Sequence, residues 1–345
     1  MQLDLFGAPE EPTSKPAVAP VDFAPRLAEI ANRLPAQVYF GTSSWAFEGW
    51  RGLVFAPDAP KTKLSRYGLA AYAQHPLFRS VGLDRTYYAP IAASDFAAYG
   101  DMVPDDFRFL VKAHELCTLP VFRGNGRYPQ RQGEVNAAFL DPSYTHDQVV
   151  APFVEGLQGK VGPLLFQFPP LSVAAVGGPQ RFAERLHAFL DALPLGPLYA
   201  VELRNRDLFT SAYIDALVAT DTVHCFNVHP TMPPIHQQFQ AARATCTART
   251  LVVRWMLHPH QRYAGAKRRY EPFDRLIDED LDNRQAIARM CLETAASHQP
   301  AVIIVNNKAE GSSPLTIQKL AEALVLMQEG RPDDASAATH IPLSS

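Results

Sequence analysis

The chain has 345 residues, of which 47% are hydrophobic, and its 32 basic and 35 acidic residues give a net charge of −3. It is long enough to bury one large core or two smaller ones, and its balanced charge excludes an overall field that attracts nucleic acid or an anionic membrane. Four cysteines without a CxxC pair exclude a zinc ribbon, and no apolar run approaches a membrane span, so we expect a cytoplasmic protein with reduced thiols and no membrane partner.

The first 20 residues are predicted to form a disordered tail. APEEPTSKPAVAP, residues 8–20, contains four prolines and a single large apolar residue, so it cannot bury enough surface to fold. QLDLF, which precedes it, resembles the short peptide by which bacterial DNA-repair and replication proteins dock on the sliding clamp. The resemblance implies that Leu3, Leu5 and Phe6 fill hydrophobic pockets while Gln2 makes amide hydrogen bonds. The alternative is a tail that folds back over the protein's own apolar surface.

Segments with strand and helix periodicity alternate along the rest of the chain. The strands are apolar on both faces, as parallel strands covered by helices must be. They are expected at 37–41, 78–84, 107–114, 162–168, 198–204, 222–229, 249–257 and 301–307. Helices are expected at 23–34, 64–75, 94–102, 146–160, 179–193, 211–220, 279–297 and 314–329.

Eight β/α units in about 300 residues predict an α/β fold, a closed (β/α)8 TIM barrel that forms a single domain with loop insertions over residues 21–330. An open doubly wound sheet is the alternative, but no GxGxxG motif follows any expected strand. The helix at 23–34 precedes the first strand, where it would cap the bottom of the barrel. Residues 331–345 are polar and are predicted to form a C-terminal tail.

Polar and aromatic side chains occupy the C-terminal ends of the expected strands, where TIM barrels carry their active sites. A buried lysine, carboxylates, arginines and amides at one mouth would bind an anionic ligand. The alternative is a structural network in which these groups neutralise one another. The main candidates are Ser43, Ser44, Trp45, Asp84, Lys112, His114, Gln167, Glu202, Arg204, Asn227, His229, Arg254, Asn306 and Asn307.

Five segments resemble successive motifs of the domain of unknown function 72 (YecE-like) family. They are GTSSWAFEGWRGLVFAP, VKAHELCT, GPLLFQFPP, AVELRNRDLF and VIIVNNKAEGSSP, and the resemblance spans roughly residues 38–328. It implies a TIM barrel and, by the family's name, no established activity. The family's polar positions fall on Lys112, Gln167, Glu202, Arg204, Asn306 and Asn307.

The chain departs from the family pattern at positions that bear on activity. In VGLDRTYY, Gly82 stands where a glutamate is usual and Asp84 where an asparagine is usual. The family has a threonine–histidine pair after the third strand, and ELCTLP offers no match for it. It also has an arginine–histidine–glycine stretch in the seventh strand; here the segment reads RWMLHP, and only Arg254 matches securely. If the missing groups are catalytic in the family, the chemistry has shifted or been lost, although Asp84 offers a carboxylate from the same strand.

A catalytic metal is the less favoured alternative for this mouth. The available ligands are Asp84, His114, Glu202 and His229. None has the HxH or HExxH spacing of a local metal motif, and Lys112 and Arg204 would compete with a cation. The sequence therefore assigns neither a metal nor a cofactor.

Two local basic segments follow the third and seventh strands, on the expected active face. The first, VFRGNGRYPQRQ, is a Gly-rich loop with Arg123, Arg127, Tyr128 and Arg131. The second, YAGAKRRYEPF, is an insertion with Tyr263, Lys267, Arg268, Arg269 and Tyr270. Cations interleaved with aromatic rings suit the backbone and bases of nucleic acid, whereas ordinary solvated loops are the alternative.

These patterns predict an enzyme that acts on an anionic substrate, phosphorylated or nucleic acid, and is recruited to DNA by the sliding clamp. The catalytic candidates are Glu202 as general acid or base, Lys112 and Asp84; the substrate-binding candidates are Arg204, Gln167, Asn306, Asn307, Arg254 and Trp45. The alternative is a non-catalytic binding or adaptor protein whose Gly82 marks a vacated site. For an enzyme, Glu202 should lie within reach of Lys112 or Arg204 in an open pocket.

Overall fold

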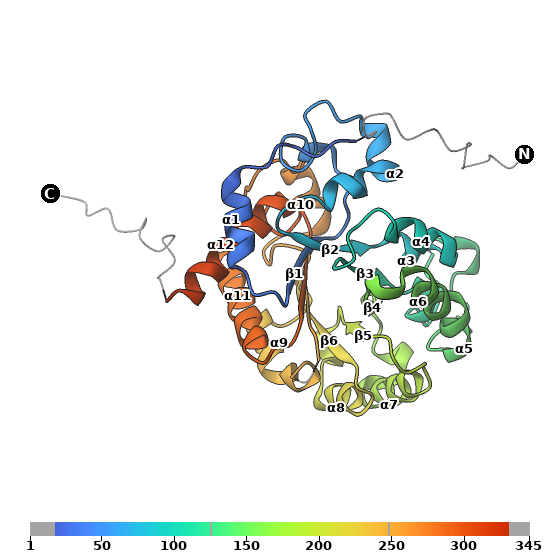
Figure 1. Ribbon diagram of the computed structural model, residues 1–345. Coiled ribbons are helices and arrows are strands. Elements are labelled where there is room, and N and C mark those ends of the chain that lie inside the picture. Colours follow the sequence, from blue (N-terminus) through green and yellow to red (C-terminus); the bar gives the residue numbers. More distant parts are fainter. Residues whose placement is uncertain (1–17, 125, 248, 331–345) are drawn as a thin grey trace, which may run out of the picture.

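Eight parallel strands form a closed barrel surrounded by helices in the computed structural model, which describes residues 18–124, 126–247 and 249–330 (Figure 1). The strands are β1 (Val38–Thr42), β2 (Phe78–Leu83), β3 (Arg108–Lys112), β4 (Val161–Gln167), β5 (Tyr199–Glu202), β6 (Val223–Val228), β7 (Leu251–Trp255) and β8 (Ala301–Val305). Each pairs with its sequence neighbour, and β8 pairs with β1, which closes the sheet. The predicted TIM barrel is confirmed, and an open doubly wound sheet is excluded.

Eight helices correspond to those expected from the sequence. They are α1 (Pro25–Arg33), α2 (Lys61–Tyr72), α4 (Ala93–Gly100), α6 (Ala151–Leu157), α7 (Gly178–Asp191), α8 (Ser211–Ala219), α11 (Leu281–Ala296) and α12 (Ser313–Gln328). The helix expected from residue 146 begins with a π-helical turn, His146–Val150, before α6 continues it. Helix α1 lies along α12 (Figure 1). Arg26 of α1 pairs with Glu322 in α12, and Arg33 of α1 pairs with Glu329, just after the end of α12. Helix α1 therefore packs on the side of the barrel, and the predicted cap at the bottom was wrong.

Four further helices were not predicted. They are α3 (Arg85–Tyr88), α5 (Pro142–Thr145), α9 (Ile235–Ala242) and α10 (Tyr263–Tyr270). Helix α9 separates β6 from β7, for which the sequence suggested no intervening helix. Helix α10 contains the second basic segment, and its Ala266 and Tyr270, one turn apart, are buried. That segment is an ordered helix, which corrects the alternative of a solvated loop.

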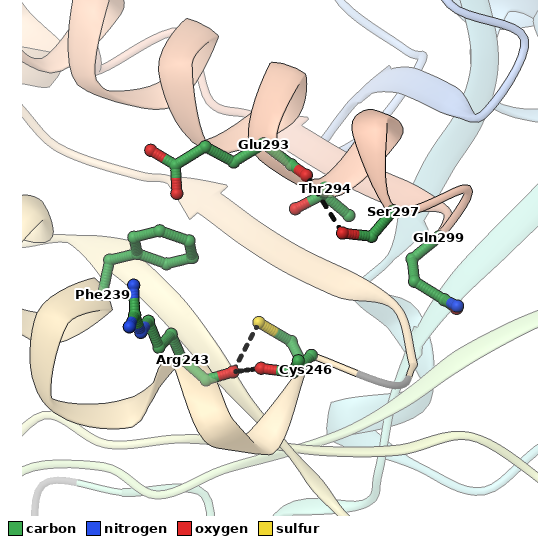
Figure 2. Close-up of a pocket in the computed structure, with 8 residues that line it drawn as sticks. Phe239, Arg243, Cys246, Glu293, Thr294, Ser297 and Gln299 are labelled. Carbon is green, nitrogen blue, oxygen red and sulfur yellow. Dashed lines mark hydrogen bonds between the residues drawn. The ribbon is translucent and has the colours of Figure 1, made fainter.

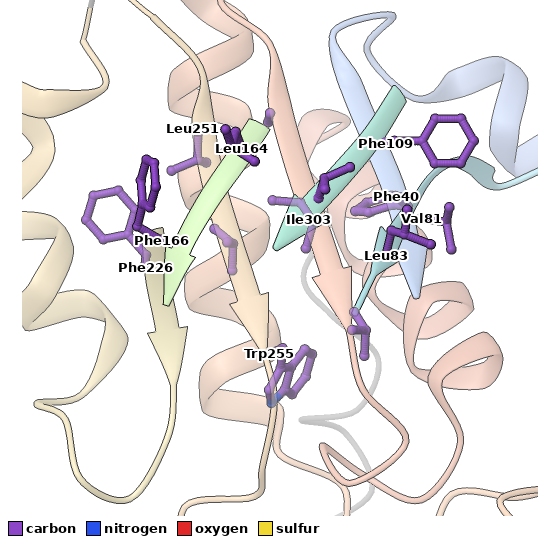
Figure 3. Packing of buried hydrophobic residues seen from close by; sticks show 14 of the residues in the cluster. Phe40, Val81, Leu83, Phe109, Leu164, Phe166, Phe226, Leu251, Trp255 and Ile303 are labelled. Carbon is purple, nitrogen blue, oxygen red and sulfur yellow. The ribbon is translucent and has the colours of Figure 1, made fainter. Parts of the chain in front are cut away.

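Alternation along the strands separates two cores. Outward-facing side chains, among them Phe40, Val81, Phe109, Phe166 and Phe226, pack beneath the helices (Figure 3). Inward-facing side chains fill the barrel itself: Leu110, Leu165, Ala200, Val223, Cys225, Val252, Val302 and Ile304. This interior is apolar and closely filled, so any site has to lie at an end of the barrel.

Most of the predicted tails lie outside the described residues, but the end of the N-terminal one is ordered. Val18 is buried, Ala19 accepts from the backbone of Ala56, and Pro20 pairs with Phe55, so disorder up to residue 20 was wrong for these three residues. The clamp-binding candidates Gln2, Leu3, Leu5 and Phe6 belong to residues 1–17, and the expected C-terminal tail is residues 331–345. Within the described part of the chain, none of the helices combines the length and apolarity that a membrane span requires.

Candidate active site at the mouth of the barrel

A ring of polar side chains replaces the apolar interior at the C-terminal ends of the strands. Because successive side chains of a strand alternate between its two faces, the residue two positions beyond each inner-core residue also points inward. Lys112 follows Leu110 in this way, and Arg254 follows Val252. We call the following residues the polar ring: Ser43, Asp84, Lys112, Gln167, Glu202, Arg204, Arg254 and Asn306.

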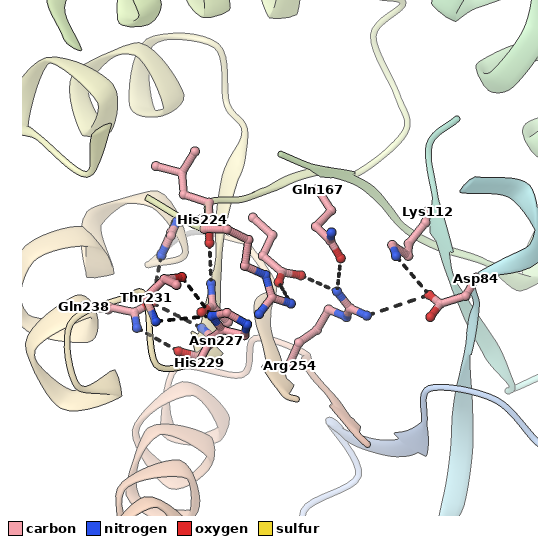
Figure 4. A network of polar contacts seen from close by, with 12 residues as sticks. Asp84, Lys112, Gln167, His224, Asn227, His229, Thr231, Gln238 and Arg254 are labelled. Carbon is pink, nitrogen blue, oxygen red and sulfur yellow. Dashed lines mark hydrogen bonds and ion pairs between the residues drawn. The ribbon is translucent and has the colours of Figure 1, made fainter. Parts of the chain in front are cut away.

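Glu202 holds two arginines at the centre of the polar ring. It is fully buried, and its two carboxylate oxygens pair with Arg204 and Arg254. Burial opposes ionisation, but the two guanidinium groups outweigh it and keep the pKa of Glu202 below its usual range. Arg254 also donates to Gln167 Oε1 at 3.1 Å and lies 3.7 Å from Asp84 Oδ1 (Figure 4). Glu202 therefore fixes both arginines in place.

Lys112 is the lysine of the polar ring, and its ammonium group is weakly satisfied. Its Nζ lies 3.7 Å from Asp84 Oδ1 (Figure 4) and 4.2 Å from the centroid of the Tyr87 ring. Both contacts are longer than a hydrogen bond. The residue is 6% exposed, and burial lowers the pKa of Lys112, although Asp84 partly offsets that effect. Asp84 is more open, with 35% of its side chain exposed.

Positive charge exceeds negative charge at this mouth. Lys308, just beyond β8, is 9% exposed, and burial lowers its pKa to about 8 against the attraction of Asp84. Lys112, Arg204, Arg254 and Lys308 thus face two carboxylates, those of Asp84 and Glu202. At the rim, the exposed Arg127 lies 3.6 Å from Glu115, a long contact that offsets part of its charge. The surplus of cations in a desolvated site favours an anionic ligand.

The geometry of Glu202 does not suit the predicted general acid or base. A general acid at neutral pH needs a raised pKa, and a general base needs a free oxygen within reach of the substrate. Glu202 has a lowered pKa, no exposed surface and an arginine on each oxygen. It lies beside Arg204, as expected, but it is fully buried and not in an open pocket, so the condition set for an enzyme that uses Glu202 as acid or base is not met, and its role is to position the arginines.

Asn306 and Asn307 are separated by the alternation of the strand. Asn306 belongs to the polar ring, where its amide donates to Ser43 Oγ at 2.7 Å and its oxygen accepts from the backbone of Lys308. The oxygen of Asn307 instead accepts from Trp50 Nε1 and from the backbone and hydroxyl of Ser313, at the start of α12. Asn307 therefore anchors a helix and does not face the mouth.

Trp45 also lies away from the polar ring. Its indole nitrogen donates to the backbone oxygen of Ser65 in α2, and its ring packs edge-on against Tyr99 in α4. The side chain is buried between these helices. The predicted contact of Trp45 with substrate would require these helices to separate.

Two histidines stand near the mouth in neutral form. Burial lowers the pKa of His114 to about 4, and Arg127 adds to that effect. Burial likewise lowers the pKa of His229 to about 4, with Arg204 adding to it. Among the residues described, no group of three or more His, Cys, Asp or Glu side chains is arranged to hold a metal ion.

Comparisons with known proteins agree with this architecture. Residues 39–340 match the family described as protein of unknown function DUF72. The chain belongs to the DUF72 family. A DUF72 protein from Thermotoga maritima MSB8 is 20% identical with a TM-score of 0.54, covering 84% of this chain and 99% of that chain.

A second DUF72 protein, from Enterococcus faecalis V583, is 15% identical with a TM-score of 0.52, covering 83% of this chain and 95% of that one. At these identities the two structures support the fold alone. A comparison with curated proteins found no match.

Gly82, where the resemblance implied a glutamate, is closely packed. Gly82 faces the barrel interior one step below Asp84, and a Cβ atom there would lie 3.2 Å from Ser43 Cα and 3.5 Å from Ile304 Cγ2. A glutamate would require β1 to move by a few tenths of an ångström. This chain thus presents its carboxylate one layer nearer the mouth, on Asp84.

Sequence reasoning missed Lys308 and the contact of Tyr87 with Lys112. Lys308 directly follows the doubled asparagine in VIIVNNKAEGSSP, so the sequence placed it next to the strand end. The sequence did not show that its side chain points toward the mouth. Tyr87 was noted beyond the second strand, but the short helix α3 that turns its ring over Lys112 left no pattern in four residues.

The predicted basic segments are largely paired. Arg131 pairs with Glu134 at 2.8 Å, Lys267 with Glu271 at 3.7 Å and Arg269 with Asp278 at 2.7 Å. Arg123 donates to the backbone oxygen of Pro170. The segments therefore carry less free positive charge than their composition suggested.

A pocket at the other end of the barrel does not belong to this site. It is lined by Phe239, Arg243, Cys246, Thr247, Glu293, Thr294, Ser297 and Gln299 (Figure 2). Thr247 and Gln299 precede β7 and β8 in the chain, so the pocket lies at the N-terminal ends of the strands. In TIM barrels that face serves stability.

Proposed function

We propose that this DUF72 protein is an enzyme that binds an anionic substrate at the polar ring. Substrate groups such as phosphate or carboxylate would be held by Arg204, Arg254 and Lys112, and the Lys112–Asp84 pair would transfer a proton. The observation that carries the proposal is the buried surplus of cations around a carboxylate that fixes two of them.

Unpartnered donors support a bound anion. Arg204 Nη1 and Arg254 Nε are buried and have no hydrogen-bond partner among the described residues. Buried polar groups nearly always have partners, and leaving one unpaired costs about 1–3 kcal/mol. A substrate oxygen would satisfy these nitrogen atoms, and the fixed positions of the arginines would lower the entropic cost of binding.

Lys112 suits proton transfer because burial lowers its pKa toward the working range of a general base. Asp84 Oδ1 lies 3.7 Å from Lys112 Nζ, and 35% of the Asp84 side chain is exposed, so this carboxylate connects the buried lysine with solvent. The roles therefore follow: Glu202 positions the two arginines, the arginines and Lys112 bind the anion, and Lys112 with Asp84 also transfers the proton.

A non-catalytic ligand-binding or adaptor protein is the second candidate. It is favoured by the full burial of Glu202 and by the glycine at position 82, which together remove the inner carboxylate from chemistry. Both candidates bind an anion, so the distinction lies in turnover. Conversion of a bound phosphorylated compound that Lys112→Met abolishes would favour the enzyme.

Replacing Lys112 with methionine should weaken binding of pyrophosphate by about 10- to 100-fold, since a charge-assisted contact contributes about 1.5–3 kcal/mol. The melting temperature should change little, because the ammonium group has only a 3.7 Å ion pair and one aromatic contact. Isothermal titration calorimetry measures the affinity and circular dichroism the melting temperature.

Lys160→Met is the matched control. Lys160 is also largely buried, but it donates to the backbone oxygens of Gly100 and Val103, between helices at the other end of the barrel. Its loss should lower stability and leave the pyrophosphate affinity unchanged. Equal affinities of the wild type and Lys112→Met would contradict the assignment of the anion site.

We further propose that Gln2, Leu3, Leu5 and Phe6 dock on a bacterial sliding clamp. The support is the sequence QLDLF followed by a proline-rich segment, which lies outside the described residues. Residues 7–17, if extended, would form a tether of about 11 residues at roughly 3.1 Å each and would let the barrel act tens of ångströms from the clamp. Docking would bring the anion site close to DNA.

A peptide of residues 1–10 should bind purified clamp with micromolar affinity, typical of a short segment ordered on binding. Leu5→Ala with Phe6→Ala should abolish binding, because these side chains supply most of the apolar contact. Glu10→Ala is the matched control and should bind normally. In the full chain, the double change should leave the melting temperature unchanged; a loss of several degrees with no peptide binding would identify the tail as a structural strap.

A further inference from the structure

Two exposed tyrosines flank the polar ring. Tyr88 ends α3, just beyond β2, and is 49% exposed; Tyr263 begins α10, beyond β7, and is 64% exposed. Partial burial raises the pKa of the Tyr88 phenol, and the nearby Asp84 carboxylate and Tyr263 phenol raise it further. The two phenols and the Asp84 carboxylate are thus near enough to influence one another electrostatically.

Each ring has a cation near it and is about half exposed or more, although Tyr87 also packs edge-on against Tyr88. The guanidinium carbon of Arg127 lies 5.1 Å from the centroid of Tyr88, and Lys308 Nζ lies 4.5 Å from the centroid of Tyr263. Exposed single tyrosines are ordinary on a protein surface. Two such ring–cation pairs at the entrance of one cationic site are a combination that binds a planar ring and an anion together.

We propose that the mouth binds single-stranded nucleic acid, with bases stacked on both Tyr88 and Tyr263 and phosphates paired with Arg127 and Lys308. The proposal rests on the proposed anion site and names its substrate class. In a duplex both faces of a base are already stacked, so stacking on these rings requires a single strand or a base turned out of a helix.

The charge arrangement favours a strand over a free nucleotide. Arg127 and Lys308 follow β3 and β8, so the two cations lie on different sides of the mouth. Arg268, exposed on α10, adds a cation further along the rim. Cations spaced across a rim suit successive phosphates of a chain. A phosphorylated sugar would use the cations and leave both aromatic faces bare.

Fluorescence anisotropy of the full chain with a labelled oligothymidylate tests the proposal. Tyr88→Ala and Tyr263→Ala should each weaken the affinity roughly 5- to 150-fold, the range measured for loss of a base–aromatic stack. An abasic oligonucleotide of the same length carries the same phosphates, and its weaker binding should not change in either variant. Phenylalanine at either position should restore the affinity, because it keeps the ring.

Tyr67→Ala is the matched control. Tyr67 is 40% exposed and has Arg66 at 5.2 Å from its centroid, but it lies within α2, away from the strand ends. Its replacement should leave the oligothymidylate affinity unchanged. Equal loss in this variant would show a general surface effect and overturn the proposal.

The remaining outcomes separate this proposal from the anion site. Equal wild-type affinities for oligothymidylate and the abasic strand would overturn base stacking, while a response of pyrophosphate binding to Lys112→Met would keep the anion site. Thymidine monophosphate that binds as tightly as the oligonucleotide would overturn the assignment to a strand. Loss of the pyrophosphate response itself would remove the proposed function and this inference with it.

Discussion

Replacing Glu202 with alanine should destabilise the protein by about 3–5 kcal/mol, the cost of leaving buried charges without their partner. Arg204 and Arg254 are 8% and 1% exposed, and Glu202 meets each of them with one oxygen. Burial lowers the pKa of Arg204 despite Glu202, whereas for Arg254 the carboxylates of Glu202 and Asp84 outweigh burial and raise its pKa. Because both arginines stay charged, removal of Glu202 leaves two buried positive charges that repel each other in the folded protein. Urea unfolding measures the loss.

Two variants make this result specific to buried charge. Glu202→Gln keeps the shape and one acceptor, so it should lose less stability than the alanine variant. Glu184→Ala removes an exposed partner of Arg181, at 3.1 Å on α7, and should cost less than about 1 kcal/mol. If Glu202→Ala cost as little as this control, solvent or other groups would be satisfying the arginines, and the positioning role would be wrong.

The barrel was predictable because its evidence is distributed along the whole chain. Each strand is a short apolar run and most helices have an amphipathic period, so a local error leaves the count of β/α units intact. Helix α10 was not predicted, because YAGAKRRY contains a single large buried side chain, Tyr270, and no side chain caps its first turn. Its fold depends on packing against Leu257 and Phe273, which no local pattern reveals.

The polar ring was predictable in membership but not in roles. Its residues end parallel strands, and parallel strand ends meet at one face. Which of two neighbouring residues faces into the barrel depends on the exact register of the strand. Asn306 therefore contacts Ser43 at the mouth, whereas the next residue, Asn307, contacts Ser313 on the opposite face. The burial of Glu202 depends on two arginines arriving from different points of the chain, one of them 52 residues further on. Roles that depend on such tertiary pairing cannot be obtained from spacing.

The same tertiary pairing decides how the protein responds to acid. The His75 ring stacks on the Phe78 ring with 3.8 Å between the ring centroids, and its Nδ1 accepts a hydrogen bond from the backbone N–H of Leu77. His224 lies between Tyr213 and Gln238, hydrogen-bonded to both. Burial lowers the pKa of His75 from 6.5 to about 3 and that of His224 to about 4. Both rings are therefore neutral in the folded protein across the pH range in which an unfolded chain would protonate them.

Lowering the pH from 7 to 5 should therefore cost about 3 kcal/mol of stability through His75, His224 and Glu310, and His114 and His229, whose pKa values burial also lowers to about 4, should add to that loss. Below pH 6.5 the unfolded chain binds protons that the folded protein rejects, so stability falls with pH until the folded pKa values are reached. At pH 5 His75 and His224 each contribute a loss of about 2 kcal/mol, at 1.36 kcal/mol per pH unit. Burial raises the pKa of Glu310 to about 6, so its protonation returns about 1 kcal/mol over the same range. Urea unfolding at the two pH values measures the difference.

A phenylalanine at position 75 isolates the titration from the packing. It keeps the stacking on Phe78 but cannot bind a proton, so its own cost at pH 7 is set by the lost acceptor for the backbone of Leu77. Whatever that cost is, the loss of stability between pH 7 and pH 5 should shrink by about 2 kcal/mol relative to the wild type. An unchanged loss would mean that His75 reaches solvent readily enough to protonate in place, and that the acid response arises elsewhere in the barrel.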